Sequence, residues 1–216
     1  MPLLLHIHAS PKGPLSTSLR LAQAFLAEVQ RLEPETDVQH LDLFEAELPE
    51  FGRDAALAKF APIYGYDRTE AQEKLWDEVR ARIAEFAAAD RILLSTPMWN
   101  YSIPYRLKHY LDIIMQPRET MGFDARAMQH FGLLTNRPVQ FILTRSSVLP
   151  GDHGDFQLPY LKFSFESIGL RDISVLSAWR TTQASAEARE NYVVSFEEQA
   201  RSAAAAFLTQ PLSKTA

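Results

Sequence analysis

The apolar residues of this chain follow two patterns that alternate along its length. In residues 17 to 32, Leu21, Phe25, Val29 and Leu32 recur at the spacing of one helix face, with charged residues between them. Short apolar runs without this spacing separate the helical stretches and predict strands. The predicted helices are 17–32, 69–88, 104–115, 159–168 and 184–207. The predicted strands are 3–8, 38–44, 91–96, 139–144 and 171–178.

The strands at 3–8, 91–96 and 139–144 are apolar at nearly every position. Strands of this kind are buried on both faces, as in a parallel sheet between two helix layers. The alternation of strand and helix therefore predicts an α/β fold, a doubly wound five-stranded parallel sheet flanked by helices on both faces. We expect a single domain over residues 1–208 and a frayed tail at 209–216. The remaining stretches are expected to be a long excursion with one short helix at 45–68, an irregular segment at 117–136 and a loop at 146–158.

Composition narrows the function classes. The 216 residues are 46% hydrophobic, enough for a full core, and they include no cysteine, which excludes disulfides, thiolate zinc sites and a cysteine nucleophile. The net charge of −5 and the scattered Lys and Arg residues argue against nucleic acid as a partner. No run approaches the ~20 apolar residues that span a membrane, and the first residues lack the pattern of a signal peptide. We therefore expect a cytoplasmic protein that acts on small molecules.

Hydroxyl groups follow the first predicted strand. Ser10 follows the end of that strand, and Ser16, Thr17 and Ser18 open the next helix. In an open parallel sheet, ligands bind outside the carboxyl ends of the strands. The loop lacks the glycine patterns of dinucleotide-binding and triphosphate-binding folds, and with Gly13 as its only glycine it is a poor cradle for a pyrophosphate. A helix N-terminus with several hydroxyls suits a single phosphate, although Ser16 alone would also serve as an ordinary N-cap.

The loop after the strand at 91–96 reads Pro97-Met98-Trp99-Asn100-Tyr101-Ser102-Ile103-Pro104. It places two large aromatic rings and an amide at a strand end. A flat conjugated ligand would cover these rings, and the backbone N–H groups around Asn100 would reach its polar edges. Packing of Trp99 and Tyr101 in the core or at a subunit contact is the alternative.

Together, these two segments resemble the FMN-dependent NAD(P)H azoreductases and quinone reductases, which share a flavodoxin-like fold. The family follows its first strand with a Ser, five further residues and Ser-x-Ser, as in Ser10 and Ser16-Thr17-Ser18 here. Its Pro-Met-Tyr-Asn-Phe-x-x-Pro motif corresponds to residues 97–104. The resemblance implies that the FMN phosphate is bound by Ser10, Ser16, Thr17 and Ser18. It implies that the isoalloxazine ring is lined by Pro97, Met98, Trp99, Asn100 and Tyr101.

The resemblance also implies a ping-pong reaction. A reduced nicotinamide, NADH or NADPH, delivers hydride to FMN and leaves, and a quinone, azo compound or nitroaromatic then accepts two electrons in the same place. Family members are typically homodimers in which the partner subunit completes the flavin pocket. Residues 45–68 and 117–136, with Phe123 and Phe131, are the candidate contributors. A flavodoxin-like electron carrier, a regulatory flavoprotein with little turnover and a serine phosphodiesterase stay open as other functions.

Two segments depart from the family. Thr144-Arg145-Ser146-Ser147 stands where the family has Thr-Ser-Arg-Gly-Gly, and these residues are candidate cofactor contacts whose serines would change how the pyrimidine edge of the ring is held. Glu166-Ser167 stands where Gly-Phe is usual. Arg145 and His153 are candidates to polarise an acceptor or to favour the anionic reduced flavin.

His6 and His8 alternate along the first strand and therefore share one of its faces. Such a pair resembles a metal-binding arrangement. No cysteine and no paired carboxylate at ligand spacing accompanies them, so we expect ordinary packing and no metal site.

Overall fold

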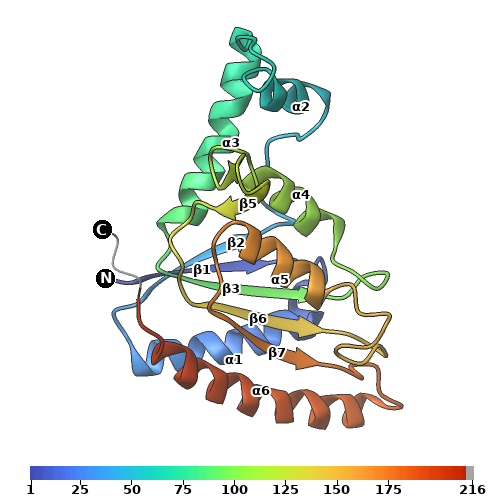
Figure 1. Cartoon of the computed structure of the whole chain (residues 1–216). Coiled ribbons are helices and arrows are strands. Elements are labelled where there is room, and N and C mark those ends of the chain that lie inside the picture. The colour runs from blue at the N-terminus through green and yellow to red at the C-terminus, as the bar shows by residue number, and fades with distance from the viewer. Residues whose placement is uncertain (213–216) are drawn as a thin grey trace.

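Five parallel strands form the central sheet of the protein (Figure 1). The computed structural model describes residues 1–212. The strands are β1 (Leu3–His8), β2 (Asp37–Asp42), β3 (Arg91–Pro97), β6 (Val139–Thr144) and β7 (Ile173–Ala178). Their order across the sheet is β2-β1-β3-β6-β7, so the strand order reverses between β1 and β3. This is the predicted doubly wound sheet.

Helices cover both faces of the sheet (Figure 1). The helices α1 (Thr17–Leu32) and α6 (Ala186–Leu208) lie on one face, and α3 (Glu70–Ala88), α4 (Tyr105–Ile114) and α5 (Leu158–Ser167) lie on the other. Alternate residues of each strand feed the two cores: Leu4 packs with α1 and α6, whereas Leu5 and Ile7 pack with α3, α4 and α5. Burial on both faces explains why the central strands have no polar alternation.

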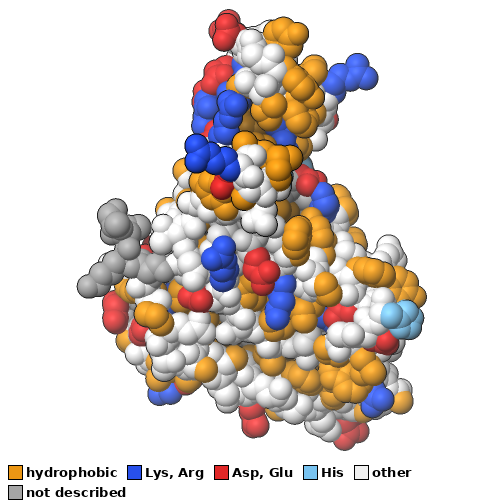
Figure 2. All heavy atoms as spheres, viewed as in Figure 1, with side chains coloured by type: hydrophobic (Ala, Val, Ile, Leu, Met, Phe, Trp, Pro, Cys, Tyr) orange, Lys and Arg blue, Asp and Glu red, His pale blue; other side chains and the backbone are white. Residues whose placement is uncertain are grey.

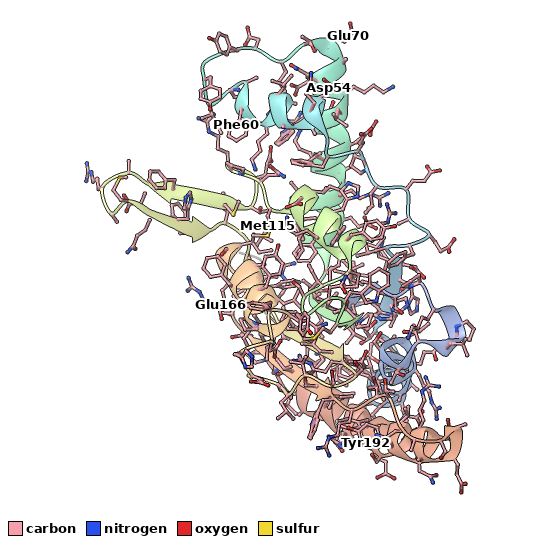
Figure 3. The ribbon with its side chains drawn as sticks, turned by 90° about the vertical axis from the view of Figure 1, so that its right-hand side faces the viewer. Asp54, Phe60, Glu70, Met115, Glu166 and Tyr192 are labelled. Atoms are coloured by element: carbon pink, nitrogen blue, oxygen red, sulfur yellow. The ribbon has the colours of Figure 1, made fainter. Side chains whose placement is uncertain are left out.

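An arm projects from this body (Figures 1 and 3). It consists of α2 (Arg53–Phe60), which is the one short helix expected in residues 45–68, and the first part of α3. Thr69 begins α3 with a capping box, because its side chain accepts from the Gln72 N–H while the Gln72 side chain accepts from the Thr69 N–H. The arm therefore has a well-defined start to its longer helix.

The expectation of an irregular segment at 117–136 is wrong. The strands β4 (Met121–Asp124) and β5 (Gln129–Gly132) form an antiparallel hairpin there. It was missed because each strand has only four residues and little burial, which leaves no clear apolar period. A glycine anchors the hairpin to the body, since a Cβ at Gly132 would lie 2.0 Å from the Gly169 nitrogen.

The bounds of several elements also differ from the predicted ones by one or two residues. β2 ends at Asp42, two residues before the predicted end, because the Asp42 carboxylate accepts from the Phe44 N–H and turns the chain. The last helix, α6, ends at Leu208, and Gln210 beyond it donates to Ser174 Oγ of β7. The expected frayed tail lies partly outside the described residues, at 213–216. Within the described chain, every helix is too short or too polar to span a lipid bilayer.

Candidate cofactor site

The carboxyl ends of β1, β3, β6 and β7 meet at one edge of the sheet (Figure 1). Backbone hydrogen bonds continue past the strand ends and tie the loops together. The Ala9 N–H donates to the Ser95 carbonyl, the Met98 N–H donates to the Thr144 carbonyl and the Arg145 N–H donates to the Ala178 carbonyl. The loops predicted to bind a ligand therefore leave the sheet side by side, at the reversal of strand order where such sheets bind ligands.

The hydroxyl loop after β1 wraps onto the N-terminus of α1. Ser16 is the N-cap, and its Oγ accepts from the Leu19 N–H at 3.2 Å and lies 3.1 Å from Ser18 Oγ. Ser10 is 2% exposed, and its Oγ has no hydrogen-bond partner. Ser16 thus caps the helix, the ordinary role that the sequence allowed, and its part in phosphate binding stays a prediction. Ser10 has a buried oxygen without a partner and precedes a 16-residue helix whose first N–H groups favour an anion.

The loop after β3 makes a tight turn. The Trp99 N–H donates to the Ser102 carbonyl at 3.0 Å and the Ser102 N–H donates back to the Trp99 carbonyl at 2.9 Å. Asn100 and Tyr101 between them have φ of 44° and 68°, a conformation that costs a residue with a side chain of order 1–3 kcal/mol. Tyr101 is 60% exposed at the tip, so it does not pack in the core. The turn holds two strained residues at the sheet edge.

Aromatic rings gather behind that turn. Trp99 lies with its ring centroid 6.0 Å from that of Phe44 and 6.5 Å from that of Tyr105, and Phe44 and Tyr105 are 5.8 Å apart. Phe44 comes from the segment after β2 and Tyr105 begins α4, so three elements contribute to this cluster. Trp99 is thus partly packed, and the cluster forms an aromatic wall beside the turn.

The loop between β6 and α5 is organised by one buried ion pair. Arg145 Nη1 lies 2.5 Å from Asp155 Oδ2, and both side chains have no exposed surface. Burial opposes ionisation of Asp155, but the Arg145 guanidinium and the N–H groups of Gly151 and Leu158 outweigh it and hold the pKa of Asp155 below its ordinary value. The Phe156 N–H also donates to the Tyr101 carbonyl, which fixes this loop to the turn after β3.

The other candidates in this loop are exposed. Ser146 and Ser147 lie at the surface shortly after β6, whereas Thr144, the last residue of β6, is buried. The His153 side chain is 98% exposed and its Nδ1 lies 2.9 Å from Asp152 Oδ1 at the loop surface. The Arg145 side chain is buried and the His153 side chain is exposed. The two residues named as candidates to polarise an acceptor therefore do not lie in one place.

Comparison with known proteins agrees with this geometry. Residues 3–201 match the model of a family described by its flavodoxin-like fold. The chain belongs to this flavodoxin-like family. The chain is also similar to relatives from Ruegeria pomeroyi and Pseudomonas syringae pv. tomato, each named an FMN-dependent NADH:quinone oxidoreductase. The first is 42% identical over 81% of this chain and 87% of its own length, and the second is 35% identical over 94% and 98%.

Solved structures share the flavodoxin-like fold. An azoreductase from Bacillus anthracis str. Sterne superposes with a TM-score of 0.84, at 24% identity, over 96% of this chain and 100% of its own. A second structure, of an FMN-dependent NADH-azoreductase from Bacillus anthracis str. Ames Ancestor in complex with FMN, has a TM-score of 0.79 and 24% identity, over 94% of this chain and 100% of its own. These likenesses confirm the fold.

Three features of the flavodoxin-like site were missed by the sequence pattern. The histidines of β1 are buried, as expected, and both lie within hydrogen-bond distance of Ser95 of β3, a contact that the pattern did not indicate. Arg189 of α6 donates to Thr17 Oγ1 at 3.2 Å, which brings a cation from the end of the chain to the hydroxyl loop. Phe44 joins the aromatic wall. Only the alternating positions of His6 and His8 on the first strand gave any signal; the other two contacts depend on distant segments of the chain.

The departures at residues 166–167 lie on α5 (Figure 3). Glu166 is exposed, and the Ser167 hydroxyl donates to the Phe163 carbonyl one helical turn back. Within residues 1–212, no group of three or more His, Asp or Glu side chains is arranged to hold a metal ion.

Proposed function

We propose that this protein binds FMN at the carboxyl edge of its sheet and uses it to transfer electrons from NADH to quinones, the activity for which its relatives are named. Azo compounds, the substrates named for its structural neighbours, and nitroaromatics are the further acceptors that we propose. One observation carries the assignment. The buried Ser10 hydroxyl has no partner among the described residues, and it lies just past the carboxyl end of β1, six residues before the N-cap of α1. The strand β1 pairs with β3, which precedes the aromatic turn.

The residues present fit FMN better than a dinucleotide. The hydroxyls of Ser10, Thr17 and Ser18 and the free N–H groups of the first turn of α1 suit one phosphate, and the loop has no glycine-rich turn that would admit a second. Trp99 and the turn at its side suit a flat ring system. The two features follow neighbouring strands, β1 and β3, which would place a phosphate after one strand and an aromatic ring after the other.

Each part of the chain then has a role. When bound, FMN supplies the two-electron carrier, so the protein itself needs to bind and orient rather than to provide an acid and a base. Ser10, Ser16, Thr17 and Ser18 hold the phosphate. Pro97 to Tyr101 line the ring, and the backbone after Thr144 flanks its other edge. We propose that Ser146 and Ser147 approach the ring through their backbone, while Arg145 holds the loop in place through its buried ion pair with Asp155.

The same open face serves donor and acceptor in turn. Tyr101 is 60% exposed and Tyr105 66% exposed, which leaves aromatic surface on which a nicotinamide or a quinone can stack. His153 is a candidate to contact an acceptor because its side chain extends freely from the neighbouring loop. Since one face is shared, oxidised nicotinamide must leave before the acceptor binds. We propose the cytoplasm, where reduced nicotinamides are available, as the location.

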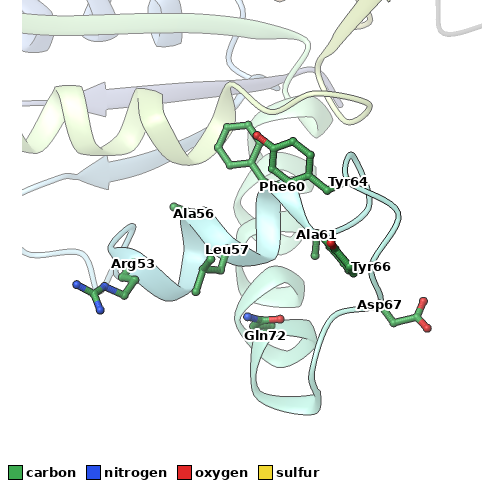
Figure 4. A pocket seen from close by; sticks show the side chains of 9 residues that line it. All are labelled: Arg53, Ala56, Leu57, Phe60, Ala61, Tyr64, Tyr66, Asp67 and Gln72. Carbon is green, nitrogen blue, oxygen red and sulfur yellow. The ribbon is translucent and has the colours of Figure 1, made fainter.

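We further propose a homodimer joined in part through the arm. Large apolar side chains gather there (Figure 2), and Leu57, Phe60, Ile63, Tyr64 and Tyr66 are each between 41% and 71% exposed. Phe60 and Tyr64 stack in a pocket between α2 and α3 (Figure 4). Exposed apolar surface of this extent marks an interaction site, and a second copy of the chain is the partner we propose. Leu57→Glu should shift the protein to monomers in sedimentation experiments, and a dimer that survives it would contradict this arm contact.

The decisive experiment follows the visible spectrum of the purified protein. It is titrated with FMN, and NADH or NADPH is then added separately without oxygen, followed by a quinone. The expected result is saturable FMN binding, loss of the oxidised flavin band with NADH, and its return on addition of the quinone. The rate with NADPH gives the donor preference.

Other outcomes would favour the other functions. Flavin that binds but accepts only single electrons from a protein would indicate an electron carrier, and bound flavin with negligible turnover would indicate a regulatory protein. Failure to bind FMN would overturn the proposal, and phosphodiester cleavage by the FMN-free protein would replace it with hydrolysis.

A further inference from the structure

Four polar side chains form a continuous hydrogen-bonded chain across one face of the sheet. His40 Nδ1 on β2 lies 3.1 Å from His6 Nδ1 on β1. The other nitrogen of His6, Nε2, lies 2.9 Å from Ser95 Oγ on β3, and Ser95 Oγ lies 3.1 Å from His8 Nδ1. The chain therefore runs from an exposed residue, His40, through two buried ones to His8 at the end of β1.

The inner end of this chain lacks a partner. His8 is 4% exposed, and its Nε2 is buried without a hydrogen bond. Ser10 lies two residues further along the chain, just past the end of β1, and its buried Oγ also has no partner. Other buried side chains, such as Tyr110 and Gln116, also have an atom without a partner. His8 and Ser10, however, lie two residues apart at the carboxyl edge of the sheet, where parallel sheets bind ligands, and Ser10 is six residues before the N-cap of α1. Together, these two atoms point to a ligand at this edge.

We infer that, in the FMN site proposed above, His8 donates its Nε2–H to the FMN phosphate and that the His40–His6–Ser95 chain fixes His8 in the tautomer that can do so. The ligand chemistry is a phosphate monoester held by a neutral imidazole, the Ser10 hydroxyl and the N-terminus of α1. His8 is thus a further phosphate-binding residue, and Ser95 is a positioning residue.

The tautomers follow from the connectivity. If His8 Nε2 carries a hydrogen, Nδ1 must accept, so the Ser95 hydroxyl donates to it. Ser95 Oγ then accepts from His6 Nε2–H, and His6 Nδ1 accepts from His40 Nδ1–H. In this arrangement each hydrogen bond contains one hydrogen, and every histidine is neutral. If every hydrogen bond ran in the opposite direction, His8 Nε2 would carry no hydrogen, and its lone pair would repel an anion. Phosphate binding therefore selects the arrangement in which His40 donates to His6, His6 to Ser95 and Ser95 to His8.

The charge state agrees with a chain of neutral rings. Burial, aided by His40 and His8, lowers the pKa of His6 to about 3. Burial also lowers the pKa of His8, against the opposing effects of the Asp42 carboxylate and the Ser10 backbone. Both rings are neutral near pH 7, so the phosphate is met by a directed N–H donor rather than by a cation.

Binding of FMN and of riboflavin, which lacks the phosphate, tests the inference. His8→Phe should raise the dissociation constant of FMN about tenfold or more and leave that of riboflavin unchanged, the effect of losing one hydrogen bond to a charged group. His8→Gln, which keeps a donor on a longer side chain, should recover most of the affinity. Equal weakening of both flavins, or no change in either, would overturn the role of His8. An unaltered protein that binds neither flavin would instead contradict the proposed function.

The positioning role has its own controls. Ser95→Ala should raise the dissociation constant of FMN about threefold with riboflavin again unchanged, whereas Ser174→Ala on β7, which removes a hydroxyl bonded to Gln210, should change neither. Nitrogen-15 NMR of labelled histidines gives the tautomer directly. With FMN bound, His8 and His6 should both carry hydrogen on Nε2 and none on Nδ1. An unprotonated Nε2 on His8, or a doubly protonated ring, would contradict the inference.

Discussion

At the β1 end of the edge, two buried polar atoms have no partner, whereas at the β6 end a buried carboxylate has several, although Arg145 Nε and the Gln157 amide are without partners there too. Ser10 Oγ and His8 Nε2 are buried and unsatisfied. Arg145 and Asp155, equally buried, form an ion pair, and Asp155 also accepts three backbone N–H groups. Because burial without a partner costs free energy, the proposed ligand would satisfy the first end, whereas the Asp155 carboxylate already has its partners and holds its loop in place.

The largest expected effect comes from breaking the paired end. Asp155→Ala leaves the Arg145 guanidinium buried without its counter-charge, and we expect the free energy of unfolding to fall by about 3–5 kcal/mol. Urea denaturation followed by circular dichroism measures this. The double variant Arg145→Met with Asp155→Leu should regain most of the loss, because apolar residues of similar volume satisfy the site. If the single variant is as stable as the unaltered protein, Arg145 is not a structural support and its proposed role is wrong.

The same pair makes stability depend on pH. Folding lowers the pKa of Asp155, so its stabilisation is fully present above about pH 4, the ordinary value of an aspartate, and is lost as the pH falls through the lowered value. Unfolding curves at pH 7 and pH 3 should therefore diverge more for the unaltered protein than for the double variant. Equal pH dependence in the two proteins would contradict the assignment.

Next in size is the loss of the unpaired hydroxyl. Ser10→Ala should raise the dissociation constant of FMN about tenfold, since a hydrogen bond to a phosphate contributes roughly 1.5–3 kcal/mol. It should not lower the stability of the FMN-free protein, because the hydroxyl has no partner to lose there. Fluorescence titration and thermal unfolding give the two quantities. A drop in stability without a change in affinity would move Ser10 from the ligand site to the scaffold.

Ser16 provides the matched comparison, because it combines both kinds of role. Its Oγ caps α1 through the Leu19 N–H, so Ser16→Ala should lower the free energy of unfolding by about 1 kcal/mol even without FMN. Ser185→Ala, which removes the N-cap hydroxyl of α6, is the control for a cap alone: it should cost a similar amount and leave FMN affinity unchanged. If Ser10→Ala and Ser16→Ala lower the free energy of unfolding equally, the Ser10 hydroxyl supports the fold as the Ser16 cap does and is not free for a ligand.

The two ends also differ in how far the sequence foretells them. Ser10 and the Ser16-Thr17-Ser18 triplet occupy a strand end and a helix start, so their spacing alone places them at the sheet edge. Arg145 also follows a strand, but its partner, Asp155, lies ten residues further on in a loop without periodicity, and nothing local indicates that the two side chains turn inward. Likewise the sheet and its helix layers followed from apolar periodicity, whereas the short exposed hairpin β4–β5 had no such signal.

The smallest expected effect concerns a residue contributed by the far end of the chain. Arg189 on α6 donates to Thr17 Oγ1 at 3.2 Å and to the Leu15 carbonyl at 3.4 Å, which places its guanidinium at the rim of the phosphate loop. Arg189→Gln should raise the dissociation constant of FMN by about two- to fourfold at low salt, because an exposed charge contributes only ~1 kcal/mol or less.

Salt and a second arginine make this last prediction specific. At about 1 M salt the screening length falls to ~3 Å, so the difference between Arg189→Gln and the unaltered protein should largely disappear. Arg201, also exposed on α6, lies twelve residues further along, about 18 Å away, and Arg201→Gln should leave FMN affinity unchanged at any salt concentration. Equal effects of the two substitutions would mean that net charge alone matters. A loss that persists in high salt would instead mean that Arg189 shapes the hydroxyl loop through Thr17, as part of the scaffold rather than of the electrostatic field around the phosphate.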